Sequence, residues 1–167
     1  GFLPSLIQLH RDPAPGLHTL YISPLKALAV DIARNLVEPA EQMGLGLRIE
    51  TRTGDTPANR RARQRQDPPQ ILLTTPESLT LLLSLPDADE MFGNLKCVVL
   101  DEIHALAGTK RGDQLALCLS RLSKLAPEMR RVGLSATVAH PRALAAWCAA
   151  DADPDKVKLV RAAGGVK

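Results

Sequence analysis

Cys97-Val98-Val99-Leu100-Asp101-Glu102-Ile103-His104 is the stretch of sequence that decides the expected fold. Its first four residues form a continuous apolar run, which is typical of a strand buried on both faces in a parallel sheet. Two carboxylates follow at once, and carboxylates beside a buried strand are costly unless they are paired or bind a metal ion. Open parallel sheets bind their ligands at the carboxyl ends of the strands. The stretch therefore predicts a buried strand that ends in an acidic pair, Asp101 and Glu102, which is either a functional site or the charged turn in which many strands end.

Short apolar runs elsewhere in the chain have the length and composition of further strands, at 19–22, 47–51, 71–74, 131–134 and 157–160. Between the runs lie amphipathic patterns typical of helices, at 25–43, 57–64, 77–83, 112–125 and 141–149. Strands that alternate with helices predict a single open α/β domain, with a parallel sheet covered by helices on both faces. The connections between its strands should be right-handed crossovers.

Composition excludes several classes of protein. The 167 residues are 45% hydrophobic and 23% charged, with a net charge of +3, which is typical of a globular domain and not of a disordered or collagenous chain. No apolar run approaches the roughly 20 residues that span a bilayer, so no membrane association is expected. Three widely spaced cysteines without a C-x-x-C pair form neither a disulfide framework nor a zinc site. They suit a reducing compartment, and a cytoplasmic location is expected.

Hydroxyl residues stand before proline at three expected helix starts: Ser23-Pro24, Thr56-Pro57 and Thr75-Pro76. A Ser or Thr N-cap followed by proline is a strong signal for the start of a helix. Helix starts also present unpaired N–H groups, which bind phosphate oxygens. Ordinary capping explains each site taken alone, whereas all three at one end of a sheet favour a track for a nucleic-acid backbone.

Arginines are dense between residues 48 and 65. This segment carries Arg48, Arg52, Arg60, Arg61, Arg63 and Arg65 against only Glu50 and Asp55. Such a surplus could hold a polyanion by counterion release, and it could equally be a solvated helix face. No aromatic residue is interleaved with the arginines, so base stacking is not indicated.

The acidic pair has a known use in phosphoryl transfer. An Asp at the end of a strand holds Mg²⁺ on the nucleotide phosphates, and a neighbouring acid orients and deprotonates the attacking water. About thirty residues downstream, the next strand exit reads Leu134-Ser135-Ala136-Thr137 and offers two small hydroxyl residues. This pattern favours a nucleotide-hydrolysing site.

Five segments together resemble the DExH-box helicases of superfamily 2, in the same order and with similar spacing. Asp101-Glu102-Ile103-His104 resembles motif II, Ser135-Ala136-Thr137 motif III, Ser23-Pro24-Leu25-Lys26-Ala27-Leu28 motif Ia, and Thr75-Pro76-Glu77-Ser78-Leu79 motif Ib. Thr53-Gly54-Asp55 falls where the family has a further nucleic-acid motif. Within the superfamily, the chain resembles the large helicase-related group most closely, with the ligase-associated bacterial DEXH-box helicases as the nearest branch.

The resemblance implies a RecA-like fold of the P-loop NTPase type and a role for each matching residue. Asp101 would hold Mg²⁺ through water, and Glu102 would activate the water that attacks the γ-phosphate of ATP. His104 and the hydroxyls of Ser135 and Thr137 would belong to the same nucleotide site and couple it to strand binding and domain movement. The nucleic-acid track would consist of Ser23, Pro24, Lys26, Thr53, Gly54, Asp55, Thr75, Pro76 and Glu77.

The sequence departs from the family by lacking G-x-x-x-x-G-K-[ST], the loop that cradles the phosphates. We therefore expect residues 1–167 to be a partial first RecA-like domain, without its first strand and P-loop and without the second RecA-like domain. The parent is expected to be an ATP-dependent DNA helicase or translocase in DNA repair. Its expected partners are DNA and a DNA ligase or nuclease of the same pathway, and the isolated chain should be inactive.

Other functions stay open at this point. A non-enzymatic nucleic-acid-binding module would keep the track and lack ATP use, and the sequence upstream of Gly1 would separate it from a motor. The sequence is also compatible with an RNA helicase of the same superfamily, because the motifs contact the nucleic-acid backbone and not the bases. An unrelated α/β hydrolase or kinase is disfavoured, since the sequence contains no nucleophile elbow and no candidate triad.

Overall fold

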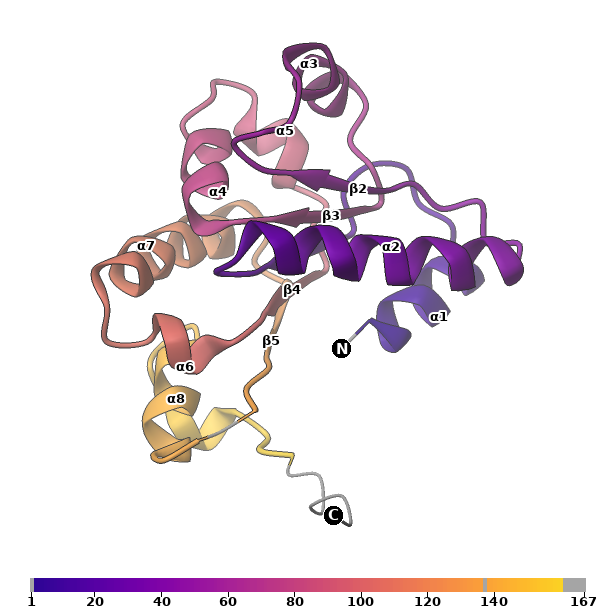
Figure 1. Cartoon of the computed structure of the whole chain (residues 1–167). Coiled ribbons are helices and arrows are strands. Elements are labelled where there is room, and N and C mark those ends of the chain that lie inside the picture. The colour runs from indigo at the N-terminus through magenta and orange to yellow at the C-terminus, as the bar shows by residue number, and fades with distance from the viewer. Residues whose placement is uncertain (1, 137, 161–167) are drawn as a thin grey trace.

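The computed structural model describes residues 2–136 and 138–160, and its strands form one parallel sheet (Figure 1). The strands are β1 (Thr19–Ile22), β2 (Ile49–Arg52), β3 (Ile71–Thr74), β4 (Cys97–Leu100) and β5 (Arg130–Gly133). Their order across the sheet is β2-β3-β1-β4-β5, and every neighbouring pair is parallel. This architecture confirms the predicted open α/β fold with helices on both faces.

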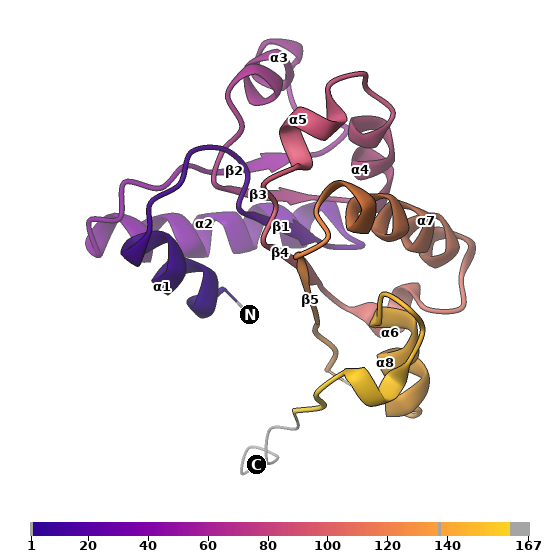
Figure 2. The ribbon, with the colours of Figure 1, turned by 180° about the vertical axis from the view of Figure 1, so that it is seen from behind.

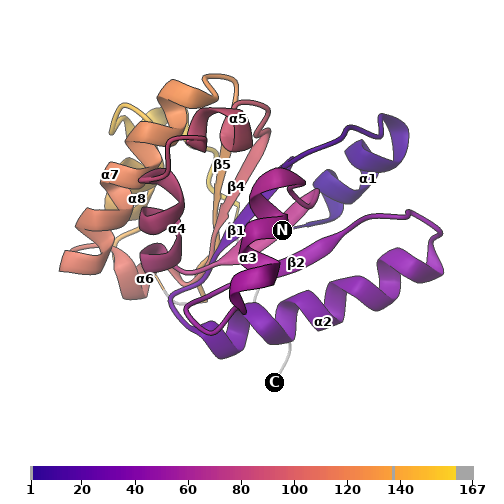
Figure 3. The ribbon, with the colours of Figure 1, turned by 90° about the horizontal axis from the view of Figure 1, so that it is seen from above.

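Helices cover both faces because successive strand residues point to opposite sides. The helices are α1 (Leu3–Arg11), α2 (Lys26–Gln42), α3 (Ala58–Gln66), α4 (Pro76–Leu83), α5 (Ala88–Phe92), α6 (Ile103–Leu106), α7 (Lys110–Leu125) and α8 (Pro141–Cys148), followed by the 3₁₀ turn η1 (Pro154–Lys156). One core contains Tyr21, Leu73 and Val99 and packs against α1 and α2. The other contains Leu20, Leu72 and Val98 and packs against α4, α5 and α7. Figure 3 shows these two helical layers with the strands between them.

The predicted strands at 19–22, 71–74 and 97–100 have the predicted bounds, and the other two differ by one or two residues. The predicted strand at 157–160 is wrong, because this segment is irregular and pairs with no strand in the described part of the chain. Leu159 is 52% exposed and Val160 is 81% exposed, so the segment buries little apolar surface. It leads away from α8 toward the C-terminal end (Figure 2). The short helices α5 and α6 were not predicted.

One of the three predicted hydroxyl caps is confirmed. Thr75 is the N-cap of α4, and its Oγ1 accepts a hydrogen bond from the Ser78 N–H at 3.4 Å. The other two predictions are wrong, because α2 begins after Leu25 and α3 begins after Pro57. Ser23 and Thr56 instead close the turns that precede these helices with their side-chain oxygens, which accept from the N–H groups of Leu25 (3.3 Å) and Thr53 (2.9 Å).

The three cysteines are all buried in the core as free thiols. Cys97 lies on β4, Cys118 on α7, and Cys148 at the end of α8. Among the helices of residues 2–136 and 138–160, none combines the length and apolar character needed to cross a membrane.

Candidate functional site

The strand registers align all five strand ends in one row. Arg52 pairs with Thr74, Thr74 with Ile22, Ile22 with Leu100, and Leu100 with Gly133. The loops that follow therefore leave from one end of the sheet, which we call the carboxyl end. The predicted nucleic-acid loops follow β2, β3 and β1, and the predicted nucleotide loops follow β4 and β5. The nucleic-acid residues, which come first along the chain (23–77), therefore lie on the β2-β3-β1 side of the sheet, and the nucleotide residues, from Asp101 onward, lie on the β4-β5 side.

Asp101 is held at the end of β4 from several directions. Its N–H donates to the Ile22 carbonyl at 2.9 Å, which continues the parallel ladder with β1. The Tyr21 hydroxyl donates to Asp101 Oδ2, and the Glu102 N–H donates to Asp101 Oδ1 at 3.0 Å. The Tyr21 ring in turn stacks on Phe2, with ring centroids 5.0 Å apart. The carboxylate is therefore oriented by its neighbours before any ligand binds.

Burial raises the pKa of the Tyr21 hydroxyl far above its ordinary value of 10.0, and the hydrogen bond to Asp101 and the negative charges of Asp101 and Glu102 raise it further. Tyr21 is the only tyrosine in the chain, so its titration can be followed without overlap.

We expect the folded chain to show no tyrosinate absorbance at pH 10 to 11, whereas the chain unfolded in guanidinium should titrate near the ordinary pKa of about 10. Because the pKa is raised on folding, the stabilisation is complete below pH 10 and is lost as the pH rises above it. Spectrophotometric titration at 295 nm measures both states. A folded-state transition at the unfolded pKa would show that Tyr21 is not hydrogen-bonded to Asp101.

Glu102 has a left-handed backbone conformation, with φ 48° and ψ 43°. For a residue with a side chain this conformation costs about 1–2 kcal/mol, and such strain concentrates at functional sites. The following residue is fixed to the next strand exit, because the Ile103 N–H donates to the Leu134 carbonyl at 3.1 Å. The chain therefore turns sharply between the end of β4 and the start of α6.

His104 joins the loops after β4 and β5. Its Nδ1 lies 2.8 Å from Ser135 Oγ and 3.2 Å from Glu102 Oε2. The predicted motif II and motif III residues are thus in direct contact across the sheet, although 31 residues separate His104 from Ser135. Thr137, the remaining residue of this predicted set, lies outside the described residues.

The residues of the predicted nucleic-acid track fall into two groups. Five of them are buried and shape the loops: Ser23, Pro24, Thr53, Thr75 and Pro76. The exposed members are Lys26, Gly54, Asp55 and Glu77. The Lys26 ammonium lies 3.1 Å from the Asp55 carboxylate, which joins the loop after β1 to the loop after β2.

Both carboxylates of the track have a cationic partner, and one partner was not predicted. Arg111, in the first turn of α7, contacts Glu77 with its Nε 2.6 Å from Oε1. Tyr21 and Arg111 are therefore the two candidate residues that sequence reasoning missed. A carboxylate on a proposed phosphate track is itself a signal that a nearby cation is needed, and this signal could have prompted a search for Arg111.

Several arginines of the segment 48–65 make contacts within the fold. Ion pairs join Arg48 to Asp67, Arg63 to Glu50 and Arg65 to Asp87. Arg52 is buried and donates to the Arg61 carbonyl at 2.9 Å. Four of the six arginines are therefore held by contacts within the fold, which favours an ion-paired helix face over a polyanion patch.

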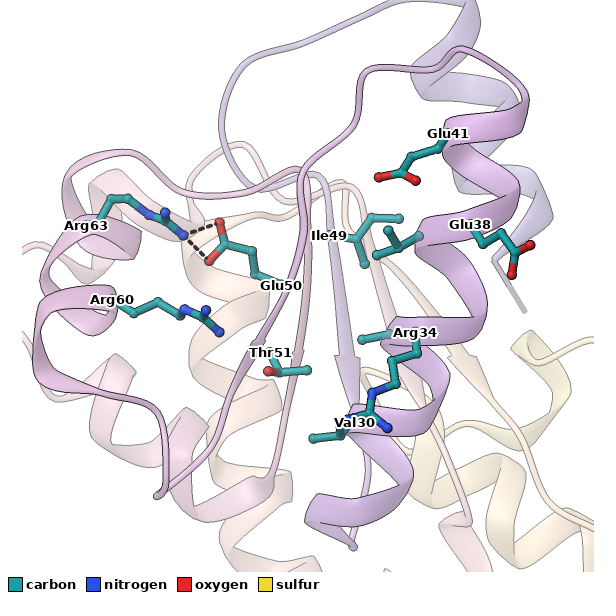
Figure 4. Close-up of a pocket in the computed structure, with 11 residues that line it drawn as sticks. Val30, Arg34, Glu38, Glu41, Ile49, Glu50, Thr51, Arg60 and Arg63 are labelled. Atoms are coloured by element: carbon teal, nitrogen blue, oxygen red, sulfur yellow. Dashed lines mark hydrogen bonds and ion pairs between the residues drawn. The ribbon is translucent and has the colours of Figure 1, made fainter.

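A groove of about 530 Å³ runs between α2, edge strand β2 and α3. Figure 4 shows Arg34 and Arg60 on its two sides, Glu38 and Glu41 along α2, and the Arg63–Glu50 pair at its rim. Its lining carries both signs of charge, so the groove shows no preference for a polyanion. It also lies away from the acidic pair, which follows β4.

The acidic pair fits a magnesium ion only together with other ligands. The described residues contain no group of three or more His, Cys, Asp or Glu side chains that could hold a metal ion. Magnesium usually binds one or two carboxylates and takes its remaining ligands from water and substrate phosphates. Asp101, half-buried and oriented by Tyr21, suits that role. The cradle for the phosphates is not supplied by this sequence, which lacks the G-x-x-x-x-G-K-[ST] loop.

Comparison with known proteins identifies similar sequences and folds. The profile of the DEAD/DEAH box helicases matches residues 1–144. A Lhr helicase/probable uracil glycosylase of Mycolicibacterium smegmatis is 45% identical over 153 residues, which cover 85% of this chain and 10% of that protein. An ATP-dependent helicase Lhr-Core of Methanothermobacter thermautotrophicus is 47% identical over 134 residues, which cover 75% of this chain and 15% of that protein.

Solved structures agree with these sequence matches. The Mycobacterium smegmatis helicase Lhr bound to ssDNA and AMP-PNP superposes with a TM-score of 0.78 at 46% identity, covering 86% of this chain and 20% of that one. The DUF1998 helicase MrfA bound to DNA and AMPPNP superposes with a TM-score of 0.77 at 30% identity, covering 87% and 21%. The present chain thus spans only a small part of each relative.

Proposed function

Because this chain belongs to the DEAD/DEAH box helicase family, we propose that it forms part of an ATP-dependent helicase motor that moves on nucleic acid. The observation that carries the proposal is the row of loops at the carboxyl end of the sheet, where the acidic pair lies beside the nucleic-acid loops. The resemblance to superfamily 2 helicases is confirmed, and the Lhr names of the relatives support the large helicase-related group. The ligase-associated branch stays a prediction.

The proposal assigns the chain to one part of the motor. Residues 1–167 belong to the first RecA-like domain, and the P-loop and the second RecA-like domain come from other parts of the parent protein. The relatives support this division, since the chain matches 10% and 15% of their lengths. Without a phosphate cradle, the isolated chain should not hydrolyse ATP.

The proposed chemistry uses few residues of this chain. Bound Mg²⁺ would supply positive charge at the β- and γ-phosphates of ATP. Asp101, which is fixed by Tyr21 and by the Glu102 N–H, would hold the ion through water. Glu102 orients the attacking water and takes its proton. His104 connects Glu102 to Ser135, so a change at the nucleotide reaches the loop after β5.

The proposed track binds the backbone of a single nucleic-acid strand along the loops after β2, β3 and β1. We propose DNA as the natural substrate, because the Lhr and MrfA structures with similar folds contain ssDNA and DNA. A role in DNA repair, a partner DNA ligase or nuclease, and a cytoplasmic location remain predictions. The exposed groups Lys26 and Gly54 are the proposed contacts, while the buried hydroxyl and proline residues hold the loops in shape.

The experiment is ATP turnover by the full-length parent, measured without nucleic acid, with single-stranded DNA and with single-stranded RNA. Turnover should rise with DNA, and a DNA duplex with a single-stranded tail should be unwound. Greater stimulation by RNA would instead identify an RNA helicase. Nucleic-acid binding without turnover would contradict the motor and support a non-enzymatic binding module.

A further inference from the structure

The turn between α6 and α7 is tightly packed, which restricts movement of one helix relative to the other. Thr109 caps α7, since its Oγ1 accepts from the Gly112 N–H at 3.1 Å and donates to the Leu106 carbonyl at 2.7 Å. A Cβ on Gly112 would lie 1.9 Å from that same Leu106 oxygen. The first turn of α7 therefore rests directly on the last residue of α6. Because α6 begins immediately after Glu102, the backbone of Arg111 is fixed relative to the acidic pair.

The Arg111 side chain reaches from this turn to two loops of the proposed track. Its Nε and Nη2 donate to the two Glu77 carboxylate oxygens at 2.6 and 3.2 Å. Nη2 also donates to the Pro24 carbonyl at 3.0 Å. The planar guanidinium can make these bonds together, whereas a lysine ammonium is a compact point donor on a flexible stem. Arg111 thus fixes the spacing between the loop after β1 and the start of α4.

The contact between Arg111 and Glu77 matters more for the positions of the two loops than for the stability of the fold. The Arg111 and Glu77 side chains are 43% and 51% exposed, and exposed ion pairs contribute little to stability because water and salt screen them. Burial acts to raise the pKa of Glu77, but hydrogen bonds from Arg111, from the backbone and from Thr75 outweigh it and lower that pKa. Glu77 is therefore charged at neutral pH and, without its partner, would repel a phosphate backbone.

We propose that Arg111 is a positioning residue that links the acidic pair to the nucleic-acid loops. It carries displacements of the segment from Glu102 to Leu106 into the loop at Pro24 and the start of α4 at Glu77. The inference rests on the proposed function and adds a mechanical connection between its two sites. Arg111 itself need touch neither nucleotide nor nucleic acid.

The test uses the full-length parent with Arg111→Ala, Arg111→Lys and, as a matched control on the same helix, Arg121→Ala. The measured quantities are the KM for ATP and the single-stranded DNA concentration that gives half-maximal stimulation. Substitutions along a network that couples two sites change the coupling by roughly 2- to 30-fold, so Arg111→Ala should raise this DNA concentration about 3-fold or more. The KM for ATP should change less than about twofold, because the contacts to the nucleotide remain. Arg111→Lys should recover part of the effect, and Arg121→Ala should match the wild type.

A double variant separates positioning from simple charge cancellation. If Arg111 acts only by neutralising Glu77, then Glu77→Gln added to Arg111→Ala should restore DNA stimulation, and the proposal is overturned. If Arg111 positions the loops, the double variant should stay defective. A thermal melting curve for each variant identifies general unfolding, which would lower the melting temperature and raise the KM for ATP as well. Such a result would assign Arg111 a structural role only.

The two proposals fail in different ways. A wild-type parent whose ATP turnover does not respond to nucleic acid contradicts the proposed function. A wild-type parent that responds normally, together with an Arg111→Ala variant that responds equally, contradicts only the positioning role of Arg111.

Discussion

Glu102→Gln in the full-length protein is expected to lower ATP turnover by at least about 100-fold, since loss of a general base costs roughly 10²–10⁴ in rate. The amide keeps the size of the carboxylate but cannot take a proton from water. The left-handed backbone at this position costs the same for Gln as for Glu, so folding should be unchanged. ATP binding should also persist, because the nucleotide contacts do not depend on the proton acceptor.

The measurement combines steady-state ATP turnover with equilibrium binding of a fluorescent ATP analogue. Glu90→Gln on α5 is the matched control, because Glu90 is an exposed glutamate on the helix that precedes β4, whereas Glu102 follows that strand. Turnover retained in Glu102→Gln would remove Glu102 from the role of base. Loss of nucleotide binding in the same variant would show that Glu102 contacts the nucleotide or its metal ion directly.

Gly112→Ala should destabilise the chain by at least about 2 kcal/mol, because the added Cβ meets a backbone oxygen that cannot rotate away. The Cβ would lie 1.9 Å from the Leu106 carbonyl oxygen and 2.7 Å from its carbon. Alanine gains about 1 kcal/mol over glycine in a helix, and this gain is too small to offset the clash. The first turn of α7 must therefore move away from α6.

Guanidinium denaturation of the chain, followed by the fluorescence of its single tryptophan, Trp147, measures this loss. Gly54→Ala is the control, because the nearest atoms to a Cβ there are the Lys26 Nζ at 3.5 Å and Cε at 3.9 Å, which is ordinary contact with a flexible side chain. A Gly112→Ala variant as stable as the wild type would show that the α6–α7 turn yields easily. That outcome would also weaken the mechanical role proposed for Arg111.

The fold could be predicted from the sequence wherever burial alone decides the structure. Residues 71–74 and 97–100 are fully buried strands in the interior of the sheet, and their short, mostly apolar segments predict the bounds of both strands. The predicted strand at 131–134 differs by one residue at each end from β5 (Arg130–Gly133), which is an edge strand and only half-buried. Residues 157–160 form no strand, because an apolar run becomes a strand only where a free strand edge lies beside it.

The candidate site was predictable in its positions and not in its contacts. Residues that follow parallel strands must share one end of the sheet, so Asp101 and Ser135 could be placed from sequence alone. The partners that hold them depend on tertiary structure, because Tyr21 and Asp101 are 80 residues apart and Pro24 and Arg111 are 87 apart. The arginine-rich segment was ambiguous for the same reason, since Asp67 and Asp87, which neutralise part of it, lie outside the segment.

The parallel register has a practical consequence for labelling. Every loop that enters a strand, such as 93–96 before β4 and 126–129 before β5, lies at the end of the sheet opposite the carboxyl end. These loops carry none of the candidate site residues, and they include exposed positions such as Asn94 and Glu128. All three native thiols are buried, so a cysteine introduced at either position offers a selective attachment point for a fluorophore. A dye placed there would report on the chain from the end of the sheet opposite both proposed sites.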